Sequence, residues 1–175
     1  VVAGVVAGAA SNVRHVRKAL NLFGSCLDPH ACFLLHRGLK TLSLRVEAQN
    51  RTALALAEFL AGSSLVERVH YTGLPRDPSH SRASTWFAGH GGLLSFRVVG
   101  GVAAADRLLS RLEYARVAPS LGGVETFASR PATTSHAGIS NELRRAMGVS
   151  DDLIRVAVGL EDAEDLIDDF RRAMG

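Results

Sequence analysis

An arginine inside an apolar stretch is the residue of this sequence with the clearest chemical potential. Arg155 lies within 153–158, a run typical of a buried strand, and residues 159–162 form a tight turn into an acidic helix start. An arginine cannot shed its charge, so its burial is costly without an anionic partner. Its planar fork suits a carboxylate held by two parallel hydrogen bonds. From these residues alone, a ligand carboxylate is as good an explanation of Arg155 as the alternative, in which it pairs with a nearby acid or extends to solvent from a sheet edge.

From residue 66 onward, the expected elements alternate between strands and helices. The patterns predict strands over 66–71, 93–99, 115–118 and 153–158, and helices over 79–87, 103–112, 140–147 and 161–174. Such an order indicates an α/β domain, a sheet with helices on one face. Ser120, followed by Gly122 and Gly123, is expected to start a turn between two of these elements.

The first sixty-odd residues are predicted to be mainly helical and to connect this domain to something else. Helices are expected over 12–23, from Asp28 to about His36, and over 41–61. The pair Asp28-Pro29 is a typical helix start, because aspartate accepts from free amides and proline suits the first helical position. Residues 1–10 are small and apolar, and they fit a buried strand and turn.

The composition excludes several classes of protein. With 47% hydrophobic residues among 175 and a net charge of +3, the chain is not a disordered one. It has no long basic run interleaved with aromatic residues, so we expect no nucleic-acid partner. The apolar opening is too short to span a bilayer and has no basic leader, so we expect no membrane contact. The sequence does not begin with methionine, and we expect it to be a piece of a longer protein.

Cysteines and histidines give no sign of a metal site. Cys26 and Cys32 match neither a metal-ligand nor a redox-pair spacing, and the seven histidines are scattered singly. We expect both cysteines to be reduced and partly buried, which favours a cytoplasmic location.

Four segments, in order, resemble the pyridoxal-phosphate-dependent enzymes of cysteine and methionine metabolism, the cystathionine γ-synthase and γ-lyase family. The resemblance extends over essentially the whole chain and implies a fold-type-I enzyme that uses pyridoxal 5'-phosphate. In one segment Thr72 replaces the proline that is usual in the family. The four segments are 34–45, 70–80, 120–137 and 152–162.

The resemblance also implies roles for particular residues. Arg155 matches the arginine that receives the substrate α-carboxylate, and Ser120 matches a serine beside the cofactor lysine, where it would help to hold the carboxylate and that lysine. Pro119 stands where several members have glutamate and others, including the plant-type γ-synthases, have proline. A proline there would leave the substrate pocket less anionic, which tilts the expectation toward a γ-synthase or a related C–S lyase.

In that family a lysine within Ser-x-x-Lys holds the cofactor, and this chain has only Lys18 and Lys40, neither in that context. The resemblance therefore implies the carboxy-terminal, carboxylate-binding part of the enzyme, beginning just after the cofactor lysine. Residues 1–64 would be the end of the large cofactor domain with a helical connector, and residues 65–175 the small α/β domain. Alone, this chain should be inactive.

The complete protein is expected to be a C–S lyase or γ-replacement enzyme of sulfur amino-acid metabolism. It would act on a small amino acid, need the missing cofactor domain as a partner, and form a homo-oligomer, a tetramer when complete. The sequence does not decide whether the enzyme is a synthase or a lyase, or whether it reacts at Cβ or at Cγ of the substrate. Two alternatives are a C–S lyase domain cut from a larger multienzyme and a non-catalytic amino-acid-binding or partner module.

Overall fold

The structure, a computed structural model, describes residues 2–175 as two compact units that divide between Ser43 and Leu44. The first unit contains α1 (Ala10–Phe23) and α2 (Pro29–Leu39), neither of which has a buried residue. The Asp28 carboxylate accepts hydrogen bonds from the amides of His30 and Ala31 at the start of α2. The helix start predicted at Asp28-Pro29 is thus confirmed, although α2 continues beyond His36.

Two expectations for the first unit are wrong. Residues 2–9 form no strand, and the side chains of Val2 and Val5 are 95% and 88% exposed; Val1 lies outside the described residues. A strand needs a hydrogen-bonded neighbour, and no described strand pairs with this segment. Cys26 and Cys32 are free thiols as expected but exposed, not partly buried, because the helices beside them bury no side chain.

One five-stranded sheet, in the order β1-β2-β5-β4-β3, organises the second unit. Neighbouring strands are antiparallel except β3 and β4, which are parallel. The sequence predicted every strand except β4, a segment of three residues. The strands are β1 (Val66–His70), β2 (Leu93–Val98), β3 (Arg116–Val117), β4 (Phe127–Ser129) and β5 (Ile154–Ala157).

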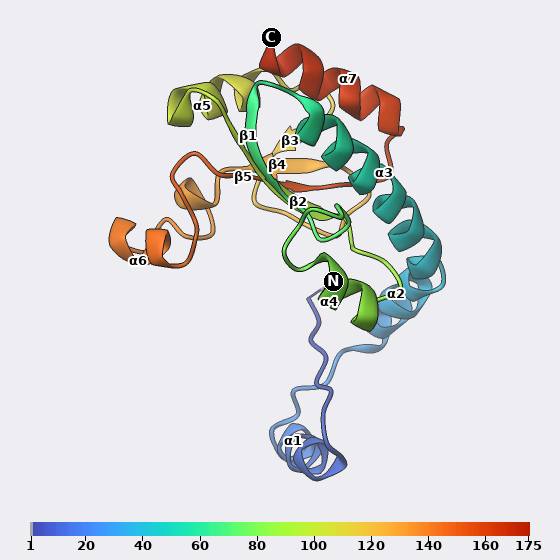
Figure 1. Ribbon diagram of the computed structural model, residues 1–175. Helices are drawn as coiled ribbons and strands as arrows, with labels where there is room; N and C mark the ends of the chain where they lie inside the picture. Colours follow the sequence, from blue (N-terminus) through green and yellow to red (C-terminus); the bar gives the residue numbers. More distant parts are fainter. Residues whose placement is uncertain (1) are drawn as a thin grey trace. The chain divides into compact units, whose positions relative to one another are not determined.

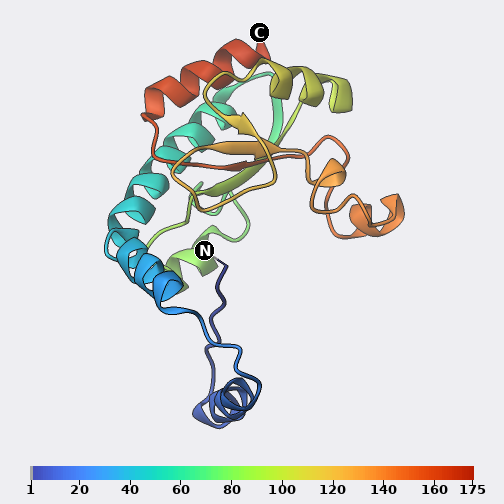
Figure 2. The same ribbon diagram turned by 180° about the vertical axis from the view of Figure 1, so that it is seen from behind.

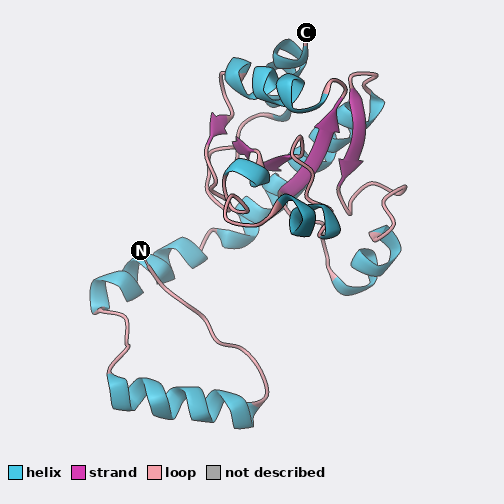
Figure 3. Cartoon of the chain, turned by 90° about the vertical axis from the view of Figure 1, so that its left-hand side faces the viewer, coloured by secondary structure: helices cyan, strands magenta, loops and turns pink. Residues whose placement is uncertain are grey.

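Three helices cover one face of this sheet: α3 (Leu42–Gly62), α5 (Gly101–Arg111) and α7 (Ala163–Met174) (Figure 1). Figure 2 and Figure 3 show the same arrangement from two other sides. The shorter elements α4 (His80–Trp86), η1 (Pro131–Thr133) and α6 (Asn141–Ala146) lie in the connections. An α/β fold with helices on one face of the sheet, as predicted, is confirmed.

The apolar core lies between these helices and the sheet. Side chains of α3, α5 and α7 pack against Phe96 of β2 and against Ile154 and Val156 of β5. Because Leu56 and Leu60 of α3 are fully buried in this core, the compact unit begins before the boundary predicted at residue 65. How the complete protein divides into domains stays a prediction.

Candidate active site on the open face of the sheet

Arg155 lies at the centre of the sheet face that the helices leave open. Its strand, β5, runs between β2 and β4. Successive side chains of a strand point to opposite faces. Because Ile154 and Val156 enter the core, Arg155 extends from the other face. The predicted buried strand is therefore correct, and the arginine is its half-buried, outward residue.

The strand register aligns four polar residues in one row across this open face. His70 of β1 pairs with Ser95 of β2, Ser95 pairs with Arg155, and Arg155 pairs with Ser129 of β4. The next row is apolar and consists of Leu93, Ala157 and Phe127. Arg155 therefore has a serine on each side and no acidic side chain beside it in the row.

The Arg155 guanidinium makes one hydrogen bond among the described residues, from Nη2 to the carbonyl oxygen of Ser120 at 3.1 Å. Its Nε atom is buried and has no partner. No described carboxylate forms an ion pair with it. A neutral carbonyl balances none of the positive charge, so this arginine keeps its capacity to bind an anion.

The nearest acids in the sequence are already paired with other arginines. Both carboxylate oxygens of Asp152 accept from Arg97 Nε, at 3.1 and 3.0 Å, and Asp151 pairs with Arg144. Burial alone would raise the pKa of Asp152, but its hydrogen bonds and the charge of Arg97 hold that pKa below its usual value. Among the described residues, a neighbouring acid as the partner of Arg155 is therefore excluded.

A buried polar network fixes the chain directly after β5. Glu161 accepts from the Thr126 amide and hydroxyl, both at 2.7 Å, and the Thr126 hydroxyl accepts from the Gly159 amide at 2.8 Å. A Cβ atom at Gly159 would lie 2.3 Å from the carbonyl oxygen of Val124, so only glycine fits there. The turn predicted after the arginine strand is thus anchored to the segment before β4.

The loop after β3 brings Ser120 to Arg155 through its backbone. Pro119 and Ser120 are exposed, and the group that accepts from Arg155 is the Ser120 backbone carbonyl; the roles expected for the Ser120 hydroxyl and the neighbouring backbone stay predictions. Gln49 of α3, only 7% exposed, donates from Nε2 to the Gly123 carbonyl at 2.8 Å and ties the same loop to the core. The loop that carries Ser120 is therefore held from two sides, and the chain bends on either side of it, at 118–119 and at 122–125.

Pro119 lines a groove of about 460 Å³ whose wall is largely apolar, with Leu109 and Val117 beside it. Asp106 and Arg130 also line the groove, and their side chains pair with each other at 2.7 Å. The acid that lines this groove is therefore paired; the role of Pro119 in a substrate pocket stays a prediction.

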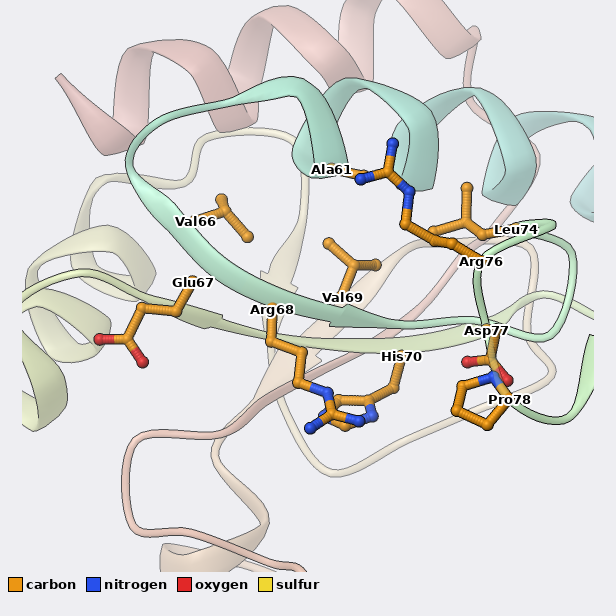
Figure 4. Close-up of a pocket in the computed structure, with 10 residues that line it drawn as sticks. All are labelled: Ala61, Val66, Glu67, Arg68, Val69, His70, Leu74, Arg76, Asp77 and Pro78. Carbon is orange, nitrogen blue, oxygen red and sulfur yellow. The ribbon is translucent and has the colours of Figure 1, made fainter.

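A second hollow follows β1 and does not include Arg155 (Figure 4). Val69 extends from β1 toward α3, whereas Arg68 and His70 extend from the opposite side of the strand. Burial, with the charges of Arg68 and Arg97, lowers the pKa of His70. His70 is therefore mainly neutral at pH 7, which leaves Arg155 as the charged member of the polar row.

Sequence reasoning missed Ser129 and Gln49. Ser129 carried no signal, because β4 itself was not predicted and register cannot be read from one strand. Gln49 was detectable, since it precedes the buried residues Ala53, Leu56 and Leu60 at helical spacing and so faces the core.

The described residues offer no metal site: within 2–175, no group of three histidine, cysteine or acidic side chains could hold an ion. No described helix combines the length and apolarity needed to cross a membrane. The two lysines, Lys18 in α1 and Lys40 at the end of α2, are exposed. The residues of the second unit around Arg155 suit a carboxylate, and neither lysine belongs to that unit.

Comparison with known proteins agrees with this arrangement. The model of the family "Cys/Met metabolism PLP-dependent enzyme" matches residues 1–175. An O-succinylhomoserine sulfhydrylase of Pseudomonas aeruginosa is 42% identical over 98% of this chain and 42% of its own length. A cystathionine γ-lyase of Bacillus subtilis is 40% identical over 99% of this chain and 46% of its own length.

A solved structure shows the same fold. The cystathionine γ-synthase of Xanthomonas oryzae, crystallised with aminoacrylate and cysteine, superimposes with a TM-score of 0.91 at 38% identity, over 97% of this chain and 44% of that one. The chain thus spans less than half the length of the relatives that it matches. The family match over the full chain, the identities and the superposition agree, and the chain belongs to the pyridoxal-phosphate-dependent enzymes of cysteine and methionine metabolism.

Proposed function

We propose that this chain is the substrate-carboxylate-binding part of a pyridoxal-phosphate-dependent enzyme that cleaves or replaces the side-chain substituent of a sulfur amino acid. The observation that carries the proposal is Arg155, a half-buried arginine on the open face of the sheet with no acidic partner among the described residues. Family membership supplies the reaction class.

In this proposal Arg155 receives the α-carboxylate of the amino acid in its fork. The Ser120 carbonyl, held at 3.1 Å from Nη2, restrains the guanidinium and so helps to fix the orientation of the substrate. Correct orientation of the reacting Cα–H bond is worth several kcal/mol of the barrier. The cofactor, when bound, supplies the electron sink for reactions at Cα, Cβ and Cγ.

The catalytic role proposed for Ser120 rests on the family match. Its hydroxyl would lie beside the cofactor lysine, which the remainder of the complete protein would supply. We also propose that the complete protein is a homo-oligomer, a tetramer, in the cytoplasm; the free thiols of Cys26 and Cys32 favour that compartment. The proposed domain division is the one given by the sequence, residues 1–64 and 65–175.

The proposal is tested by comparing the complete protein with this chain alone. With pyridoxal phosphate, the complete protein should consume cystathionine or O-succinylhomoserine. The chain alone should do neither and, after borohydride reduction, should carry no specific cofactor adduct at Lys18 or Lys40, because neither lysine lies in the required motif. Peptide mass mapping reads out the adduct. Turnover by the isolated chain, with a cofactor adduct on either lysine, would contradict the proposal.

Pro119 is proposed to keep the substrate wall neutral and so to favour an anionic γ-substituent, as the name of the sulfhydrylase relative also suggests. Pro119→Glu in the complete protein should lower kcat/KM for O-succinylhomoserine or O-phosphohomoserine by about tenfold more than for cystathionine, because like charges repel. Steady-state kinetics measure both. Pro119→Gln, which removes the proline without adding charge, is the matched control. An equal loss for all substrates would limit Pro119 to shaping the turn.

A further inference from the structure

We propose that Ser129 is the positioning residue of Arg155: its hydroxyl accepts a hydrogen bond from Arg155 Nε–H when an amino-acid carboxylate is bound. This inference deepens the function proposed above and rests on it. Neither sequence pattern nor the family match assigns a role to Ser129.

The first argument is placement. Ser129 and Arg155 are register partners of the antiparallel strands β4 and β5 and extend from the same face of the sheet. Directly opposed side chains in such a pair have Cβ atoms roughly 5 Å apart, so a serine hydroxyl and an arginine Nε are within reach of each other. Ser95, on the other side of Arg155, is less buried than Ser129.

The second argument is the state of the two polar groups. Ser129 is only 1% exposed, yet its hydroxyl oxygen has no hydrogen-bond partner among the described residues. The Nε of Arg155 is likewise buried and without a partner. Buried polar groups in folded proteins are nearly always satisfied. One donor and one acceptor, adjacent and both unsatisfied, can satisfy each other.

The third argument is what the bond would do. The Ser120 carbonyl already accepts from Nη2, and no described group accepts from Nη1. A second bond, from Nε to Ser129, would fix the plane of the guanidinium. The Nη1 side would then face a carboxylate in one orientation, and less side-chain freedom would be lost on binding.

The test compares variants of the complete, cofactor-loaded protein. Ser129→Ala should raise KM for cystathionine about tenfold and leave kcat within about twofold, because loss of one charge-assisted hydrogen bond weakens binding by that order. Ser129→Thr keeps the hydroxyl and should restore KM. Thr85→Ala, which removes an exposed hydroxyl whose described hydrogen bond goes to a carbonyl of its own helix, should leave KM unchanged.

A second measurement follows the Arg155 Nε–H directly. The Arg155 Nε–H should give an NMR signal that exchanges more slowly with water when L-norvaline, an amino acid without a leaving group, is added. Ser129→Ala should abolish that protection, an effect that loss of packing alone would not produce. Unchanged KM in Ser129→Ala, or unprotected Nε–H in the wild-type protein with norvaline, would overturn the inference.

The two proposals fail separately. If Arg155→Lys weakens binding of the amino-acid substrate while Ser129→Ala does not, only the role of Ser129 is wrong. If Arg155→Lys itself leaves KM and kcat unchanged, the carboxylate site is wrong and the role of Ser129 falls with it.

Discussion

Replacement of Arg155 by lysine in the complete protein should lower kcat/KM for its amino-acid substrate about 30- to 900-fold, which corresponds to about 2–4 kcal/mol. Lysine keeps the positive charge but replaces the planar fork by a single ammonium, so one of two parallel hydrogen bonds to the carboxylate is lost. The melting temperature should hardly change, because Arg155 forms no described ion pair and only one described hydrogen bond.

Steady-state kinetics and thermal unfolding, measured on the same preparations, separate the two roles of this residue. Arg116→Lys is the matched control, since Arg116 is an exposed strand residue of the same sheet; it should change neither quantity. An Arg155→Lys protein with unchanged kcat/KM and a much lower melting temperature would make Arg155 a structural residue, and the site would have to be sought elsewhere.

The capacity of Arg155 to bind an anion depends on its surroundings more than on its own burial. Arg144 is more deeply buried, and its Nη2 pairs with Asp151 and donates to the Asn141 side chain, although its Nε is also buried without a partner. Arg97 is held by Asp152 and Glu67. Arg155 instead faces a carbonyl and two serines. No described acid offsets the cost of placing a charge at this position, so a ligand carboxylate is the natural counterion.

The sequence was sufficient for features that depend on local order. Asp28 and Ser140 were expected at helix starts, and both side chains accept hydrogen bonds from helix amides. The acidic helix start was also expected, and it is the acidic first turn of α7, which complements the helix dipole. The buried strand around Arg155 followed from its run of apolar residues.

Features that depend on pairing between distant segments were not accessible in this way. The row from His70 through Ser95 and Arg155 to Ser129 requires the register of four strands, and periodicity within one strand says nothing about which residue of another lies opposite.

The first ten residues show that an apolar composition alone does not predict a strand. Their apolar composition predicted a buried strand, but burial also requires a partner surface, and residues 2–9 have none among the described residues.

Asp169 is a buried acid whose role is structural, and its loss should have the largest effect on stability. It lies in α7, fully buried, and accepts hydrogen bonds from three backbone amides of the segment between α5 and β3. The bonds come from Glu113 at 2.8 Å and from Tyr114 and Ala115 at 3.0 Å. This single carboxylate therefore fastens the start of β3, and with it the chain that leads to Ser120, onto the last helix.

Asp169→Ala should lower the free energy of unfolding by about 3–5 kcal/mol, because three backbone amides lose a charged hydrogen-bond acceptor. Those amides that are buried cannot bond to water instead. Domains of this size are stable by only about 5–15 kcal/mol, so much of the chain's stability would be lost. Urea unfolding followed by circular dichroism measures the change. Asp168→Ala is the control on the same helix: its carboxylate is half exposed and, among the described residues, pairs only with Arg171, so its loss should cost less than about 1 kcal/mol. Equal losses for the two variants would mean that the three amide bonds of Asp169 contribute no more than one surface ion pair.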